Sequence, residues 1–95
     1  MNAFPTVHAE PRFESDATTY RVNFWDRERP DHAWLLDAYV LVGATSVAEV
    51  MEWAHQNAAE RTFEVFVELE ADPVGDFTVP RRSVLVRLHG RNPNL

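Results

Sequence analysis

Two carboxylates and an imidazole come closest, in type and spacing, to catalytic or metal-binding chemistry in this chain. Glu49, Glu52 and His55 follow one another at intervals of three residues, in a segment with the periodicity of a helix. Glu-x-x-His is the spacing of carboxylate-bridged metal sites, but those sites take further ligands from neighbouring helices. The chain has one helical segment, so the spacing favours a solvated polar face with i, i+3 pairing over a metal site.

No other residue set strengthens an enzymatic reading. The remaining histidines, His8, His32 and His89, are scattered along the chain, and each is by default a surface side chain. There is no cysteine, no strand-turn-helix nucleophile signature and no glycine-rich phosphate loop. We expect a protein that is not an enzyme and uses no cofactor or metal. A small-ligand or metal-dependent enzyme using Glu52 and His55 is an alternative.

Length and charge bound the class of protein. The 95 residues suit one small domain, and 15 acidic against 9 basic residues give a net charge of −6. All basic residues are Arg and are interleaved with acids, which argues against a nucleic-acid partner. The chain shows neither a secretory signal nor an apolar run near the roughly 20 residues of a membrane span. We therefore expect a cytoplasmic protein without membrane contact.

The helix that positions Glu52 and His55 is predicted over Val47–Ala59. Ser46 with Glu49 three residues later is the capping-box signature of a helix start. An apolar stripe with i, i+3, i+4 spacing should face a sheet: Val47, Val50, Met51, Ala54 and Ala58. Trp53 lies roughly 120° from the centre of this stripe, at the edge of the helix.

Period-2 alternation predicts four strands. They are Thr19–Trp25, Ala33–Val42, Thr62–Glu70, and a last strand that starts at Phe77–Val79, is interrupted at Pro80 and resumes over Ser83–His89. The first two should pair as a hairpin. This order predicts an α+β domain over residues 19–90, with a four-stranded mixed sheet and one α-helix packed on one face. Two strand orders stay open, a grasp-like sheet with the first and last strands central, and a sequential one. Residues 1–18 and 91–95 are predicted tails.

The second strand is apolar on both faces, which indicates an internal or interface strand rather than a bare edge. Leu36, Ala38 and Val40 point one way, and Leu35, Tyr39 and Leu41 point the other. One helix covers one face, so the other face should meet a second copy, a partner protein, or the N-terminal tail through Phe4, Val7 and Phe13.

Six residues are the candidate interface on that uncovered face: Trp25, Leu35, Tyr39, Leu41, Phe66 and Leu85. They have the aromatic and apolar composition of an interface core. The leading prediction is a small non-enzymatic protein-interaction module that forms a homodimer or binds another protein through this face.

The third strand carries an acidic face made by Glu64, Glu68 and Glu70, with Asp72 and Asp76 nearby. Such a face is by default solvated and lies opposite arginines. We expect Arg87 and His89 of the last strand across from these glutamates. An acidic decoy for a basic, nucleic-acid-binding protein is a further alternative.

Short sequence runs between about residues 20 and 94 carry a family resemblance. They are Tyr20–Trp25, Trp34, Asp37–Tyr39, Glu49–Val50, Trp53–Ala54, Phe63–Phe66, Leu85–Leu88, Gly90 and Asn92–Pro93. In these runs the chain resembles a family of short uncharacterised actinobacterial and actinophage proteins. The resemblance implies a stand-alone intracellular domain and brings no activity or binding residues with it.

Overall fold

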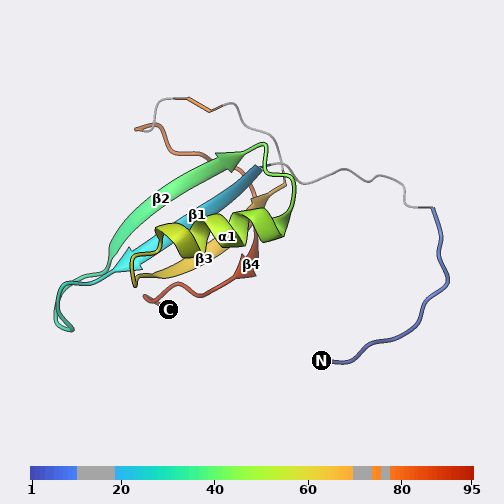
Figure 1. Ribbon diagram of the computed structural model, residues 1–95, viewed down its shortest axis with the longest axis horizontal. Coiled ribbons are helices and arrows are strands. Elements are labelled where there is room, and N and C mark those ends of the chain that lie inside the picture. Colours follow the sequence, from blue (N-terminus) through green and yellow to red (C-terminus); the bar gives the residue numbers. More distant parts are fainter. Residues whose placement is uncertain (11–18, 70–73, 76–77) are drawn as a thin grey trace.

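The computed structural model describes residues 1–10, 19–69, 74–75 and 78–95, and within them one helix lies against one sheet (Figure 1). In chain order the elements are β1 (Thr19–Asp26), β2 (Leu35–Val42), α1 (Val47–Asn57), β3 (Thr62–Glu68) and β4 (Leu85–His89). The predicted α+β fold, with a four-stranded sheet and one helix on one face, is confirmed. Thr78 and Val79 are not in a strand, and Phe77 and Glu70 lie outside the described residues.

The strand order is β2-β1-β3-β4, and each neighbouring pair is antiparallel. The hairpin of the first two strands is therefore confirmed, but the expected mixed sheet and both expected strand orders are wrong. The reason is the connection through α1, which crosses β1 and places β3 on the side of β1 that faces away from β2. Since β1 is antiparallel to both, β2 and β3 run parallel to each other without touching. This leaves β2 and β4 as the two edges.

The core lies between α1 and one face of the sheet, which we call the helix face. Alternate residues of the two central strands pack there against one side of α1: Tyr20, Val22, Phe24, Phe63 and Val65 with Val50, Ala54 and Ala58. Val22 and Phe24 are fully buried, and burial of such a side chain stabilises the fold by about 1.5–3 kcal/mol. We call the opposite face, where no described helix packs, the open face. On the central strands it carries Arg21, Asn23, Trp25, Glu64, Phe66 and Glu68, of which Trp25, Glu64 and Glu68 are buried.

Helix α1 begins as the capping signature predicts. The Ser46 hydroxyl accepts a hydrogen bond from the Glu49 backbone N–H at 3.2 Å. Of the apolar stripe predicted to face the sheet, Val50, Ala54 and Ala58 are buried, whereas Val47 is 45% exposed. The helix ends at Asn57, two residues before the expected end, because Ala59 and Glu60 take left-handed φ values of 50° and 67°.

The last strand ends at a close approach between two chain segments. Gly90 has a φ of 85°, and a Cβ atom built on it would overlap the backbone carbonyl oxygen of Phe63. Any other residue would therefore force β4 away from β3. Among the described residues, no helix is long and apolar enough to cross a membrane.

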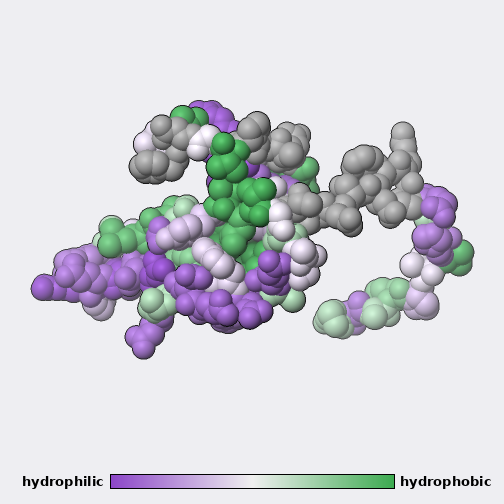
Figure 2. Space-filling model, turned by 45° about the horizontal axis from the view of Figure 1, so that its top comes forward, coloured by the Kyte–Doolittle hydropathy of each residue, from purple (hydrophilic) through white to green (hydrophobic). Residues whose placement is uncertain are grey.

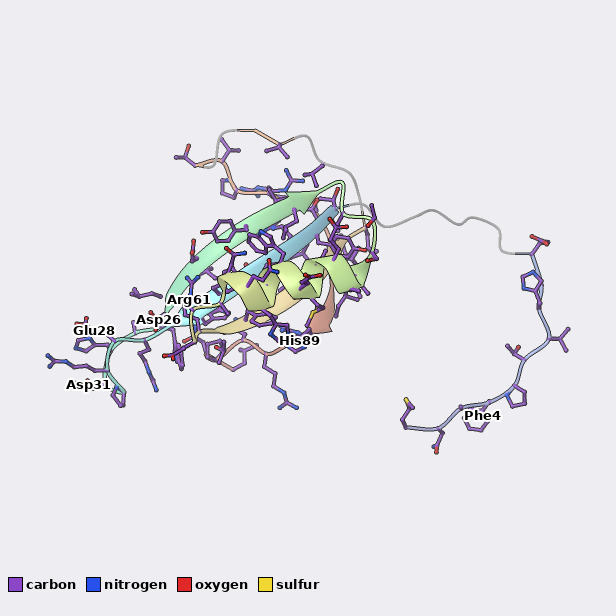
Figure 3. All side chains as sticks on the ribbon, in the orientation of Figure 1. Phe4, Asp26, Glu28, Asp31, Arg61 and His89 are labelled. Atoms are coloured by element: carbon purple, nitrogen blue, oxygen red, sulfur yellow. The ribbon has the colours of Figure 1, made fainter. Side chains whose placement is uncertain are left out.

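The described part of the N-terminal tail runs away from the sheet (Figures 1 and 3). Phe4 and Val7 are 81% and 91% exposed. These two side chains therefore do not cover the open face. Phe13, the third expected anchor, lies outside the described residues.

Candidate protein-interaction surface

The six candidate interface residues do not share one face of the sheet. The β1–β2 register sets Tyr39 beside Val22 and Leu41 beside Tyr20, so both lie on the helix face together with Leu35. Trp25, Phe66 and Leu85 lie on the open face. The alternation along β2 was predicted correctly, but the choice of the face that turns toward α1 was wrong. That choice depends on the hairpin register, which the long connection of residues 27–34 does not determine.

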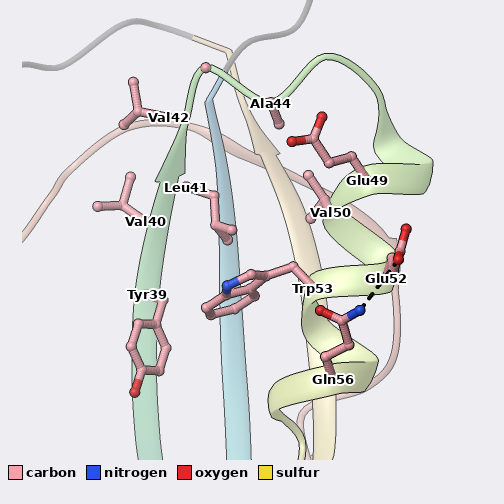
Figure 4. Close-up of a pocket in the computed structure, with 11 residues that line it drawn as sticks. Tyr39, Val40, Leu41, Val42, Ala44, Glu49, Val50, Glu52, Trp53 and Gln56 are labelled. Atoms are coloured by element: carbon pink, nitrogen blue, oxygen red, sulfur yellow. Dashed lines mark hydrogen bonds between the residues drawn. The ribbon is translucent and has the colours of Figure 1, made fainter.

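Strand β2 is an edge strand, so the internal position that its composition allowed is wrong, whereas an interface position stays a prediction. In the described part of the chain its one strand neighbour is β1. Large apolar side chains are exposed on both of its faces, with Leu35 63%, Leu36 52% and Val42 63% accessible. The open-face side chains Val40 and Val42 point away from α1 (Figure 4). Figure 2 shows hydrophobic side chains gathered over the sheet.

Strand β2 carries few of the devices that normally guard an edge strand. Charged side chains, especially Lys, and Pro discourage the addition of another strand, and β2 contains neither Lys nor Pro. Its one charged residue is Asp37, whose carboxylate lies 3.0 Å from the Arg61 guanidinium and accepts a hydrogen bond from the Tyr39 hydroxyl at 3.1 Å. This edge is therefore long, apolar and without free charge.

A groove of about 510 Å³ separates β2 from α1 (Figure 4). Its apolar part is formed by Tyr39, Leu41 and Trp53, and the centroids of the Tyr39 and Trp53 rings lie 5.3 Å apart in an edge-to-face arrangement. Glu49 and Glu52 line its helix side. Trp53 is half-buried, which agrees with its expected place at the edge of the helix.

The groove carries negative charge. Hydrogen bonds from the Thr45 hydroxyl, at 2.5 Å, and backbone N–H, at 2.9 Å, lower the pKa of Glu49, so it stays ionised. Glu52 accepts one hydrogen bond from the neutral Gln56 amide, at 3.3 Å. The hydrogen bond that the Tyr39 hydroxyl donates to Asp37 raises the pKa of Tyr39, so this phenol adds no charge to the groove near pH 7. Among the described residues that line the groove, two are acidic and none is basic.

Arg61 holds β2 and the end of α1 in place, a role that the sequence analysis missed (Figure 3). Besides its ion pair with Asp37, its Nε donates to the Ala58 carbonyl at 2.8 Å and its Nη2 to the Asn57 carbonyl at 2.9 Å. Its guanidinium also lies 4.5 Å from the centroid of the Phe24 ring. The available signal was an Arg directly after a predicted helix end, where basic side chains bind the last carbonyls.

The acidic face of β3 is buried rather than solvated. Glu64 is 1% exposed, accepts from the Trp25 indole N–H, and lies 2.6 Å from the Arg87 guanidinium. Glu68 is 8% exposed and binds Arg81 through two hydrogen bonds of 2.8 and 2.9 Å. The expectation of a solvated face is therefore wrong, although the predicted partner Arg87 is confirmed.

His89, which was expected opposite the glutamates of β3, lies on the other face of the sheet. A register shift between Val65 and Phe66 turns His89 onto the helix face, where its ring lies 5.0 Å from Phe63. His89 therefore does not face the glutamates. Glu70, Asp72 and Asp76 lie outside the described residues.

The helix residues considered for metal or enzyme chemistry do not meet a third ligand. Glu52 lines the groove, whereas the His55 ring packs edge-on against Phe63 with the centroids 5.1 Å apart. Over the residues that the structure describes, no group of three His, Cys, Asp or Glu side chains is placed to hold a metal ion.

Comparison of this chain with protein-family models, with the curated proteins and with the solved structures finds no match. The resemblance to the short actinobacterial and actinophage proteins stays a prediction.

Proposed function

We propose that this chain is a small non-enzymatic protein-interaction domain that docks through the edge strand β2. The observation that carries the proposal is the exposure of large apolar side chains on both faces of a strand that has one neighbour. The outer edge of such a strand presents backbone N–H and C=O groups on which another strand can pair. Addition of a strand to an exposed sheet edge is a recurring mode of protein recognition.

The opposite edge, β4, is less suited to this role. It has five residues against eight in β2, and its pairing with β3 is irregular between Val65 and Phe66. Short and irregular edges resist the addition of a strand. We therefore assign docking to β2 alone.

Compartment and partner class follow from composition. The absence of cysteine fits a reducing compartment, so we propose a cytoplasmic location. The net charge of −6 disfavours nucleic acid as the partner. The partner is then a protein, either a second copy of this chain or a different one.

Charged substitutions on β2 test this proposal. Leu36→Lys and Val42→Lys change exposed side chains, so the fold should persist while association weakens through charge at the edge. We expect the wild type to show a homodimer by light scattering or a purified partner bound by calorimetry, and both variants to lose that association by at least about tenfold.

Val84→Lys is the matched control, because Val84 is 56% exposed and lies outside β2. It should associate like the wild type. A wild type that is monomeric and has no protein partner would refute the proposal, as would association that the β2 variants leave unchanged.

A further inference from the structure

We infer that the occupant of β2 is an extended segment of a partner protein in which apolar side chains alternate with Lys or Arg. This inference rests on the proposed function and adds the chemical class of the partner. The segment joins the sheet as a fifth strand beside β2, with its basic side chains over the groove between β2 and α1.

The geometry of a sheet edge explains the alternation. Side chains of an added strand point by turns to the two faces of the sheet. On the open face they would meet Leu36 and Val40, which are apolar. On the helix face they would meet Tyr39 and Leu41 and the groove beyond them. The two faces of β2 therefore select different side chains.

Charge and aromatic rings select a cation on the helix face. The groove joins the carboxylates of Glu49 and Glu52 to the rings of Tyr39 and Trp53, and no described residue of its lining is basic. A guanidinium or ammonium group can stack on an aromatic ring, Trp being the best partner. The same group can pair with a carboxylate. Glu52 is exposed, and within the described part of the chain its hydrogen-bond partner is the neutral Gln56 amide, so its charge is available.

The β2 strand of a second copy lacks the complementary charge. Strand β2 contains no Lys or Arg, so pairing of two β2 strands would leave both grooves without a cation. Each chain would also bring a net charge of −6 to the contact, and like charges disfavour association. The predicted tail, residues 1–18, contains one Arg against three acidic residues. Charge thus favours a different, basic protein segment.

Selection from a random library of displayed 12-residue peptides against the full chain tests this inference. We expect the enriched peptides to alternate apolar residues with Lys or Arg. An enriched peptide is then synthesised and its affinity measured by fluorescence anisotropy. Alternate backbone amides of the peptide form two sets, and only one set donates hydrogen bonds to β2. N-methylation of that set should abolish binding, whereas N-methylation of the other set should not.

Removal of one negative charge inside the groove is compared with removal of one outside it. Glu52→Gln should weaken the peptide about fivefold, with a smaller loss at high salt. Glu28→Gln removes the same charge from the β1–β2 connection, where the side chain is 76% exposed, and should leave the affinity within about twofold. Leu36→Lys should abolish binding. Equal losses for the two Gln variants would overturn the groove assignment.

The outcomes separate this inference from the proposed function. Enriched peptides without basic residues, bound at β2, would overturn the inference and leave the docking strand in place. A chain that enriches no peptide but dimerises through β2 would overturn it in favour of a second copy. A monomeric chain that enriches no peptide would overturn both.

Discussion

At the scale of single residues, the open face of the sheet is held together by buried ion pairs. Glu64 and Glu68 are among the most buried polar side chains, and their partners are Arg87, Arg21 and Arg81. Period-2 alternation correctly predicted that the glutamates share a face. It could not predict their burial, because Arg81 comes from the segment before β4 and is distant in sequence. These carboxylates are neutralised within the chain, which removes them as acidic groups for a decoy.

Glu68→Gln should change how stability depends on pH. The hydrogen bonds from Arg81 lower the pKa of Glu68 below its usual 4.5 in the folded state. This contribution is complete above the unfolded pKa and is lost as pH falls through the folded pKa. Urea unfolding near neutral pH should show Glu68→Gln destabilised by about 3 kcal/mol, because Arg81 and Arg21 lose their partner. The difference from the wild type should shrink with acidification below about pH 4.5, and a constant difference would contradict the assignment.

At the scale of elements, local patterns predicted most boundaries. Ser46 and Glu49 set the start of α1 as predicted, and β1 and β3 differ from their predicted ends by one or two residues. The end of α1 was predicted less well. No Gly marks it, and the left-handed turn at Ala59 and Glu60 is held instead by the hydrogen bonds that Arg61 donates to the last carbonyls.

Ala59→Gly should therefore stabilise the protein. Ala59 has a φ of 50°, a conformation that costs an L-residue about 1–2 kcal/mol and costs Gly little. After the extra backbone entropy of Gly is subtracted, the free energy of unfolding should rise by about 0.5–1 kcal/mol. The control Ala48→Gly, at an exposed position within α1, should lower it by about 0.5–1 kcal/mol. Destabilisation by both changes would show that the left-handed turn is absent in solution.

At the scale of the whole molecule, the strand order and the facing of β2 could not be predicted. Both depend on pairings between distant segments, and the β1–β2 register decides that Tyr39 and Leu41 turn toward α1. The apolar character of β2 on both faces is visible in the sequence and predicts that something contacts this strand. The structure moves that contact from a sheet face to a sheet edge with an acidic groove beside it.

Amide hydrogen exchange tests the central claim, docking through β2, most directly. In the dilute free chain, the amides of β2 that do not pair with β1 should exchange rapidly. At high protein concentration, if the occupant is a second copy, or with a saturating selected peptide, residues 35–42 should gain protection of at least about tenfold while residues 85–89 do not change. Unchanged exchange in β2 under both conditions, or new protection confined to β4, would contradict the assignment of β2 as the docking strand.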